Sequence, residues 1–558
     1  MTKNGKPTDE DLSGPVVDRR TTISLLGAAG LGALAGCTGG GGGDGQNDDT
    51  DTDTDTGTTA GGGDVKTGGR LKAAWFTGSI DTLDPPYISV GQYFQVAANV
   101  FSGLVALEKD LTIRGDLAKD WTVENGGESI TFDLREGVTF HNGTEFTAAD
   151  VEYTIRRTIQ QETPAAGKLS ALKPVDDDGI ETSGDYTVTL NFEKPMAPAL
   201  VYLTRGPGRA ATIVCKEAIE EMGADQYSVT PVGTGPFEVT SHSIGSGIKL
   251  DAYDDYFGTD ENGTQLPYLD GVDIKPIPEA ATLVSALQSG DVDFANLVPL
   301  QNVDQVDSAS GVQTLRAPGI NWYGLAMNQR REPFGNKRVR EGIAKVIDNQ
   351  AFIDTAYFGN AMVARGPINK GTKWAYREDK PDTQAHDPEA GKAILEEEGA
   401  TGASFSILAT SSSLRGAKAM RQQLNAAGLD VSIEQVTSST YWNRYQKGDY
   451  DATISGSVGD PDPDQSLYNF YRLPSEDGVW NWVDYQDQEV HEWLGKQRRQ
   501  LDRDRRTETL QKIEDRLIED VPHAFLMHQD DIAAKTSAVK GFTHVPFMRN
   551  FHSVWLDE

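Results

Sequence analysis

Apolar and polar residues alternate along some segments of this chain and recur at helical spacing along others. Residues 130–134 and 186–192 place an apolar side chain at every second position, which is typical of a strand with one buried face. Between them, Thr147 and Asp150 form the sequence pattern of a capping box. The apolar residues that follow recur at every fourth position, so a helix is expected from about residue 148.

The C-terminal half of the chain alternates strand and helix patterns. In order, it shows a strand at 405–408, a helix at 414–427, a strand at 431–436, a helix at 441–447, a strand at 450–455 and helix-forming residues at 488–519. The first three elements predict a βαβ unit, because each lies between turn residues and has the length of its type. Asp387 and Pro388 further predict a helix start. The alternation as a whole predicts an α/β fold with open, mixed sheets.

The first 37 residues carry a different pattern. Arg19 and Arg20 precede a short apolar run, residues 23–35, that ends shortly before Cys37. Paired arginines ahead of such a run predict a twin-arginine export signal, and the run is too short to span a bilayer, which needs about 20 apolar residues. The stretch Leu-Ala-Gly-Cys resembles the lipobox of lipoproteins, in which the cysteine is lipidated and becomes the first mature residue. We therefore expect Cys37 to anchor the exported protein at the outer face of the cell membrane; a buried cysteine is the alternative.

Residues 38–69 consist almost entirely of Gly, Thr and Asp. No apolar residue recurs there at a helix or strand period, so we expect a disordered tether. The folded part is expected to begin near residue 70. Once Cys37 is lipidated, Cys215 has no second cysteine with which to form a disulfide.

The net charge of the chain limits the classes of partner that it is expected to bind. It has 84 acidic and 51 basic residues and a formal net charge of −33. Such a surface repels nucleic acid and anionic lipid, so no nucleic-acid partner is expected and the lipid anchor is the expected membrane attachment. An acidic excess of this size is typical of halophilic proteins, whose self-repulsion is screened when salt shortens the Debye length to ~3 Å at 1 M. An ordinary acidic secreted protein is the alternative.

The following catalytic and metal-binding motifs are either missing from the sequence or incomplete. The chain has no Gly-x-Ser-x-Gly elbow and no phosphate-binding loop, and its eight histidines show no paired metal-ligand spacing. Asp460, Asp462 and Asp464 have the opening spacing of a calcium loop, but Gln465 replaces the required glycine and Tyr471 stands where a bidentate glutamate should be. No enzymatic activity, metal or cofactor is therefore expected.

Several blocks of the sequence resemble one protein family. The blocks include residues 83–85, 100–105, 131–143, 147–151, 232–237, 286–293, 327–328, 333–334, 338–340 and 347–348. They resemble, in the same order, the family 5 extracellular solute-binding proteins, which deliver peptides, nickel and some oligosaccharides to ABC importers. Block 131–143 is the most specific. Because the blocks cover nearly the whole mature chain, the family is expected to describe its overall fold.

The resemblance implies a two-lobed fold of the type II periplasmic-binding-protein kind, with mixed sheets, a hinge between the lobes and an extra domain on the first lobe. It divides the chain into residues 70–108, 221–318 and 524–558 for the first lobe, 109–220 for the extra domain and 319–523 for the second lobe. Such proteins close on their ligand by hinge bending.

The resemblance also places a ligand site at residues 454–464. In peptide-binding relatives the backbone of this strand end pairs with an extended ligand, and an aspartate holds the ligand's amino terminus. Asp460 occupies the matching position, although Asp462 is a rival and Ser457 stands where a tryptophan is often found. A solvated acidic turn is the alternative. The candidate ligand-binding residues are Gly456, Ser457, Val458, Asp460, Tyr87, Trp322 and Tyr323, with core packing as the alternative for the three aromatic residues.

These features together predict a substrate-binding lipoprotein of an ABC transporter. The expected ligand is a di- or oligopeptide, with a nickel chelate or an oligosaccharide as the runner-up and a secreted hydrolase as the alternative class. The expected partners are membrane permease subunits with their cytoplasmic ATPase subunits, and the protein itself is expected to be a monomer. Asn142 and Asn262 each begin an Asn-x-Thr sequence and are possible N-glycosylation sites, although Asn-Gly is also a turn signal.

Overall fold

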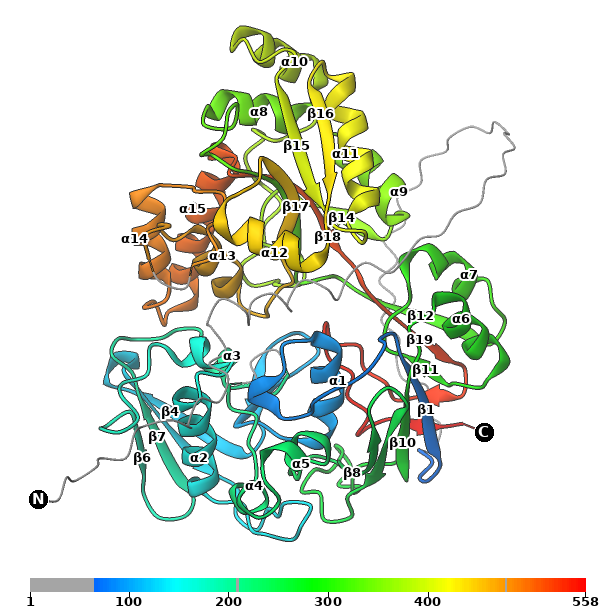
Figure 1. Cartoon of the computed structure of the whole chain (residues 1–558). Coiled ribbons are helices and arrows are strands. Elements are labelled where there is room, and N and C mark those ends of the chain that lie inside the picture. Colours follow the sequence, from blue (N-terminus) through cyan, green and yellow to red (C-terminus); the bar gives the residue numbers. More distant parts are fainter. Residues whose placement is uncertain (1–64, 207–209, 477–478, 558) are drawn as a thin grey trace, which may run out of the picture.

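A computed structural model of the chain describes residues 65–206, 210–476 and 479–557. Two large mixed sheets lie in opposite halves of the molecule, which we call the lower and upper halves after Figure 1. The lower sheet has the order β12 (Val312–Ala317), β19 (Asp531–Thr536), β11 (Phe294–Ala295), β1 (Arg70–Trp75), β10 (Gly271–Pro276), β9 (Gly247–Ala252) and β8 (Phe237–Ser243). Its centre is parallel, because β1 runs parallel to both β10 and β11.

The upper sheet has six strands. Their order is β14 (Ala361–Val363), β18 (His523–Gln529), β13 (Trp322–Met327), β17 (Ala452–Ser457), β15 (Ser404–Ala409) and β16 (Asp430–Gln435). Strands β15 and β16 are parallel, and α11 (Leu414–Ala426) connects them, which confirms the predicted βαβ unit. The other upper helices are α8 (Lys337–Val346), α9 (Asn349–Tyr357), α10 (Pro388–Glu397), α12 (Ser438–Lys447), α13 (Pro463–Tyr471), α14 (Gln488–Gln497) and α15 (Arg503–Asp520).

The lower half also contains a small four-stranded sheet. Its antiparallel order is β4 (Ala118–Glu124), β5 (Ser129–Leu134), β7 (Thr187–Asn191) and β6 (Ile180–Thr182), and α2 (Ala148–Gln160) packs on it. The predicted capping box forms, since the Asp150 carboxylate accepts a hydrogen bond from the Thr147 backbone N–H at 3.0 Å. Residues 109–220, predicted to be an extra domain, contain this whole sheet.

The remaining lower elements surround the two sheets. They are β2 (Val105–Leu107), β3 (Ile113–Gly115), β20 (Val539–Lys540), β21 (Trp555–Leu556), α1 (Gly91–Val100), α3 (Ala199–Tyr202), α4 (Lys216–Met222), α5 (Ala224–Val229), α6 (Ala280–Ser289) and α7 (Val303–Asp307). One large buried cluster of apolar side chains joins the small sheet to the lower sheet, so the lower half packs as a unit.

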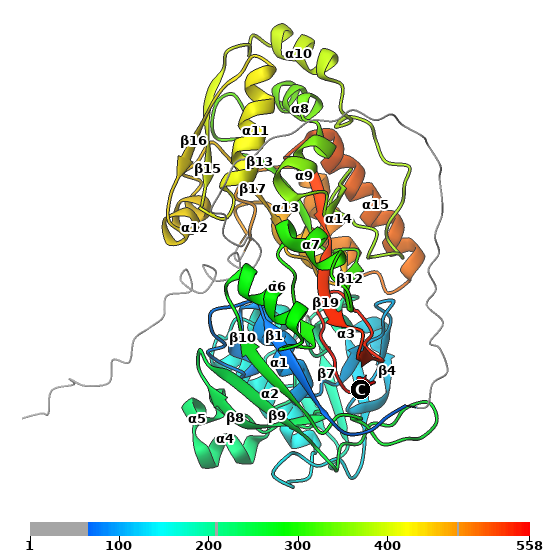
Figure 2. The same cartoon turned by 90° about the vertical axis from the view of Figure 1, so that its right-hand side faces the viewer.

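The chain crosses between the halves at two adjacent places. Strand β12 leads into β13, and β18 leads into β19, so that the crossing strands run side by side (Figure 2). The Asn321 side chain donates to the Gln529 carbonyl at 2.8 Å and accepts from the Gln529 N–H at 2.7 Å. Gly319 lets these strands approach, because a Cβ there would lie 1.8 Å from the same carbonyl. Strand β18 carries the upper half to Gln529, beyond the predicted boundary at residue 523.

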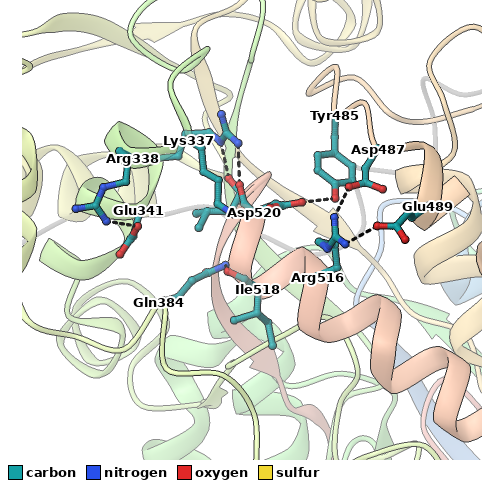
Figure 3. Close-up of polar contacts among 12 residues, drawn as sticks. Lys337, Arg338, Glu341, Gln384, Tyr485, Asp487, Glu489, Arg516, Ile518 and Asp520 are labelled. Carbon is teal, nitrogen blue, oxygen red and sulfur yellow. Dashed lines mark hydrogen bonds and ion pairs between the residues drawn. The ribbon is translucent and has the colours of Figure 1, made fainter. Parts of the chain in front are cut away.

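A group of polar side chains, which we call the Asp520 cluster, joins the ends of upper-half elements (Figure 3). Its members are Lys337, Tyr485, Asp487, Glu489, Arg516 and Asp520. Asp520, at the end of α15, accepts hydrogen bonds from Lys337 Nζ and from the Tyr485 hydroxyl, both at 2.7 Å. One turn earlier, Arg516 pairs with two carboxylates at 2.8 and 2.7 Å. The cluster ties α15 to the start of α8 and to the segment that begins α14.

Cys37, the predicted export signal and residues 38–64 of the predicted tether lie outside the described residues. Among residues 65–557, gaps aside, no helix is both long and apolar enough to span a bilayer.

Candidate functional site

The C-terminal end of β17 leaves one backbone edge without a strand partner in the described chain. On one side, β17 pairs with β13 as far as Ser457, which lies opposite Trp322. On the other side, the ladder with β15 consists of Ile407 opposite Ala452 and Leu408 opposite Thr453, and β15 ends at Ala409. Because β17 continues to Ser457, its last residues extend past the end of β15. Such an edge can pair with another extended chain.

Two glycines shape this strand end. A Cβ at Gly456 would lie 1.9 Å from the Trp322 carbonyl oxygen, so the close pairing with β13 requires glycine. Gly459 has a φ of +99°, a conformation that side-chain-bearing residues rarely adopt. Between them, Val458 is 41% exposed, which is unusual for a large apolar side chain in this fold. The chain thus leaves the sheet at Val458 and turns into the acidic segment.

Asp460 is buried and already has a cationic partner. Its Oδ2 accepts a hydrogen bond from Lys168 Nζ at 2.8 Å, and Lys168 belongs to a short 3-10 helix, Ala166–Leu169, of the lower half. Burial raises the pKa of Asp460, and the charge of Lys168 opposes that rise. The segment is therefore not the solvated acidic turn considered from the sequence. Asp460 meets a cation of the protein itself in this structure.

Asp462 has a structural role within the upper half. Its two carboxylate oxygens accept hydrogen bonds from the Arg506 guanidinium at 2.7 and 2.5 Å. The same carboxylate accepts from the Asp464 backbone N–H at 2.9 Å and so caps α13, whose first residue is Pro463. A bidentate pair with arginine is the strongest geometry available to a carboxylate, which fixes this side chain in place.

Asp464 connects the upper half to the lower half. Its carboxylate accepts a hydrogen bond from the Tyr202 hydroxyl at 2.6 Å and pairs with Arg498 at 3.2 Å. Gln497 donates to the same carboxylate and accepts from Arg506 Nε at 3.0 Å, which links it to Asp462. Burial and the nearby Asp464 charge raise the pKa of Tyr202 well above its usual range, so its hydroxyl keeps the proton that it donates.

We call these side chains the Asp460 network. Its members are Asp460, Asp462, Asp464, Lys168, Tyr202, Gln497, Arg498 and Arg506. The three aspartates with calcium-like spacing each bind a different cationic side chain. Across the described ranges, no group of three or more His, Cys, Asp or Glu residues is arranged to hold a metal ion.

The three aromatic candidates lie in different environments. Trp322 is fully buried, and its ring packs edge-on against those of His523 and Phe525, at centroid distances of 5.0 and 5.4 Å. It is therefore a core residue, because its side chain points from β13 into the upper-half core rather than toward the surface. Tyr323 is half-buried against a different upper-half core cluster, and burial raises its pKa to about 12.

Tyr87 is 39% exposed and lies on the lower half. Its hydroxyl donates to Gln161, and the Arg157 guanidinium lies 5.2 Å from the centre of its ring. Arg157 is in turn held by two hydrogen bonds to the buried Asp84. Of the aromatic candidates, Tyr87 is the one with a substantially exposed ring.

The two possible glycosylation sites are both exposed. The Asn142 side-chain amide lies 3.8 Å from the sulfur of Cys215, and its oxygen accepts from the Thr144 N–H at 3.1 Å. Asn262 lies in a turn in which the Asp260 carboxylate accepts its backbone N–H at 2.8 Å. Whether either asparagine carries a glycan stays a prediction.

Sequence reasoning missed the cationic members of the Asp460 network and Tyr202. Lys168 lies in no block of the family resemblance, and Arg498 and Arg506 lie in a helix-rich segment with many other charges. Lys168 and Asp460 are 292 positions apart, so no local pattern connects them. The calcium-like spacing was the available signal, since three buried aspartates require three partners.

The sequence matches a known family of proteins and several individual proteins. Residues 112–477 match the family described as "Bacterial extracellular solute-binding proteins, family 5 Middle", which covers more than half of the chain. A probable D,D-dipeptide-binding periplasmic protein, DdpA of Escherichia coli K12, is 25% identical over 488 residues, which cover 85% of this chain and 91% of the relative. The glutathione-binding protein GsiB of the same organism is 24% identical over 478 residues, covering 83% and 90%.

Solved structures have the same fold. The ABC transporter-associated periplasmic binding protein DppA from Helicobacter pylori, in complex with peptide STSA, superposes with a TM-score of 0.74 and 25% identity, covering 88% of this chain and 99% of that chain. The periplasmic binding protein AgaA from A. tumefacien R10, in complex with agropinic acid, has a TM-score of 0.71 and 28% identity, with the same coverage. The chain belongs to the family 5 extracellular solute-binding proteins.

Proposed function

We propose that this chain is the substrate-binding component of an ABC importer and that it binds a peptide between its two halves. The family and the relatives named above are substrate-binding proteins rather than enzymes. Two of those relatives are named for binding a dipeptide or glutathione, and a third is bound to a peptide. The permease and ATPase subunits of such an importer would be the partners.

The open edge of β17 is the observation that carries the peptide proposal. A peptide has a backbone N–H and C=O at every residue, so it can continue a sheet at a strand edge by main-chain hydrogen bonds. Residues 455–457 extend past the end of β15 and are positioned for such pairing. The exposed side chain of Val458 would then contact a ligand side chain. A metal chelate or an oligosaccharide has no repeating backbone of this kind.

The two strand crossings at Asn321 and Gln529 support hinge closure over such a ligand. Both crossings are short and lie side by side, so a small rotation there would change the separation of the halves without breaking either sheet. The division into two lobes and an extra domain, proposed from the sequence, fits this arrangement, with the hinge at residues 318–321 and 529–530.

Thermal unfolding of the full chain, purified without denaturation, tests the ligand class. The probes are peptides of two to five residues, a nickel–histidine chelate, an oligosaccharide and agropinic acid. A peptide at 100 times its Kd should stabilise the fold by about 2.7 kcal/mol, while the other probes leave the midpoint unchanged. Stabilisation by another probe and by no peptide would contradict the proposal.

Hydrogen exchange then locates the ligand. Backbone amides in residues 454–458 should exchange more slowly in the presence of the peptide that stabilises the fold, because new main-chain bonds protect them. Unchanged exchange there would remove the strand edge from the binding site.

Because Lys168 already neutralises Asp460, N-acetylated and free peptides should bind with affinities within a few fold of each other. A loss of several hundred-fold on acetylation would instead assign the ligand amine to Asp460.

The proposed location is the outer face of the cell membrane, after export by the twin-arginine route and lipidation of Cys37. The paired arginines, the short apolar run and the lipobox-like stretch support it. One acyl chain alone binds membranes only marginally, so a diacyl group is expected. Cys37→Ser should release the protein from the membrane fraction. Retention of the variant as tightly as the parent would contradict the anchor.

A further inference from the structure

We propose that the Asp460 network is a latch that holds the two halves together through contacts made only by protein groups. Such a latch acts on the equilibrium between closed and open forms of the protein itself, which is distinct from ligand binding. Asp460 and Asp464 form its upper side, and Lys168 and Tyr202 form its lower side.

Within the described part of the chain, polar contacts that cross from the lower to the upper half at this place include the following three. Lys168 Nζ donates to Asp460 at 2.8 Å, and the Tyr202 hydroxyl donates to Asp464 at 2.6 Å. The Ala197 backbone N–H donates to the Arg498 carbonyl at 2.7 Å. Because the third contact joins two backbone groups, a substitution of a network side chain does not remove it directly. It therefore reports whether the two halves are in contact.

The contact is balanced in charge. Three carboxylates, those of Asp460, Asp462 and Asp464, meet three cationic side chains, those of Lys168, Arg498 and Arg506. Removing a carboxylate from water is costly unless a cation and hydrogen bonds replace the solvent. Each carboxylate here has both, so the contact between the halves leaves no carboxylate of the network unpaired.

The lower side of the latch is braced. Lys168 Nζ lies 4.6 Å from the centre of the Tyr202 ring, a distance at which an ammonium is attracted to an aromatic face. The two residues that cross to the upper half therefore hold each other in position. Their upper partners are held as well, because Asp460 accepts a hydrogen bond from the Asp462 backbone N–H at 3.4 Å and Asp464 accepts one from Gln497 within the upper half.

The latch and the strand crossings lie at different ends of the contact between the halves. In Figure 1, α3 faces α13 on the left, whereas β12 and β19 connect the halves on the right. Rotation about the crossings would therefore separate Lys168 from Asp460 and Tyr202 from Asp464 together. The network is placed where a small hinge rotation produces a large displacement.

Native hydrogen exchange of the full chain tests the latch, with the peptide that contains Ala197 as the probe. Lys168→Gln and Asp460→Asn each leave one charged partner in a buried contact. We expect each to raise the equilibrium for opening, and with it the exchange of this peptide, by roughly a hundredfold or more. The double variant should recover part of the protection, since it leaves neither charge. Scattering should report a larger radius of gyration for the single variants.

Lys337→Gln is the matched control, because it removes one lysine–aspartate pair from the Asp520 cluster without touching the contact between the halves. It should leave exchange at Ala197 unchanged. Tyr202→Phe offers a milder change if either charge variant fails to fold. Unchanged exchange and radius in Lys168→Gln, Asp460→Asn and Tyr202→Phe would overturn the latch, as would an equal rise in the control. None of these measurements requires a ligand, so they do not depend on the peptide proposal.

Discussion

The Asp460 network and the Asp520 cluster use the same chemistry in different surroundings. Each contains a lysine–aspartate pair, an arginine bound to a carboxylate and a tyrosine that donates to an aspartate. The side chains of Lys168 and Asp460 are 10% and 2% exposed, whereas those of Lys337 and Asp520 are 50% and 16% exposed. Water can replace a lost partner in the second pair but hardly in the first. Burial, rather than the kind of contact, therefore decides how much each pair matters.

The two groups also differ in what they join. The Asp520 cluster links α8, α15 and the start of α14, all within the upper half (Figure 3). The Asp460 network links the upper half to the lower half through side-chain contacts that lie away from the two strand crossings. The first can be lost only by local loosening or unfolding, while the second can be lost by a rotation that leaves both halves folded.

The largest expected difference is between two arginines. Arg506→Met leaves Asp462 buried without its cation and should lower the free energy of unfolding by about 3–5 kcal/mol. Arg516→Met removes a partly exposed arginine from the Asp520 cluster and should cost about 0–1 kcal/mol. Urea unfolding of both variants measures the difference. Equal losses would mean that burial does not separate the two groups.

Coupling within the two lysine–aspartate pairs should differ less. Double-mutant cycles with Lys168→Gln and Asp460→Asn should give a coupling energy of about 2 kcal/mol, within the range for contacting residues. The cycle with Lys337→Gln and Asp520→Asn should give less than about 0.5 kcal/mol. A larger coupling in the exposed pair would reverse the comparison.

Alkaline pH should separate opening from unfolding. The pKa of Tyr202 is raised in the closed form, by burial and by Asp464 and Asp460 against the opposing charge of Arg498, whereas in the open form an exposed tyrosine has a pKa of about 10. The contribution of Tyr202 to closure is therefore fully present below pH 10 and declines as pH rises above it. The protection factor of the Ala197 amide, which compares its exchange with that of an unfolded chain at the same pH, should fall above pH 10 in the parent and fall less in Tyr202→Phe.

The pKa of Tyr485 in the Asp520 cluster is also raised, by burial and by Asp520. Its partners lie within the upper half, so its contribution should be lost in unfolding rather than in opening. Tyr485→Phe should therefore reduce the alkaline dependence of the unfolding free energy and leave that of Ala197 exchange unchanged. The opposite result would place the Asp520 cluster at the contact between the halves.

Salt should produce the smallest difference between the groups. Molar KCl should weaken the Lys337–Asp520 coupling by a few tenths of a kcal/mol and leave the buried Lys168–Asp460 coupling nearly unchanged. Salt should instead stabilise the whole chain, since screening of its net charge of −33 reduces self-repulsion. Its thermal midpoint should therefore rise from low to molar KCl. A midpoint that does not rise would count against halophilic adaptation.

Local patterns in the sequence predicted several helices and strands, and the ordered blocks of resemblance predicted the family. The alternation in residues 130–134 and 186–192 predicted β5 and β7, and Thr147 and Asp150 predicted the start of α2. Such features depend on residues within one or two turns of each other, so they are readable from a single sequence. The order of the family blocks predicted the two-lobed fold, and similarity to solved structures agrees with it.

Tertiary structure alone decided the partners of the acidic segment. The family resemblance implied a ligand site at Asp460, and only the fold shows that Lys168 reaches Asp460 from 292 positions away and Tyr202 reaches Asp464 from 262 positions away. It also turned the Trp322 ring into the core. A charged or aromatic residue has the same local pattern whether it faces a ligand, a core or another half of the molecule. Only the packing of distant segments determines which of these it meets and whether water is excluded there.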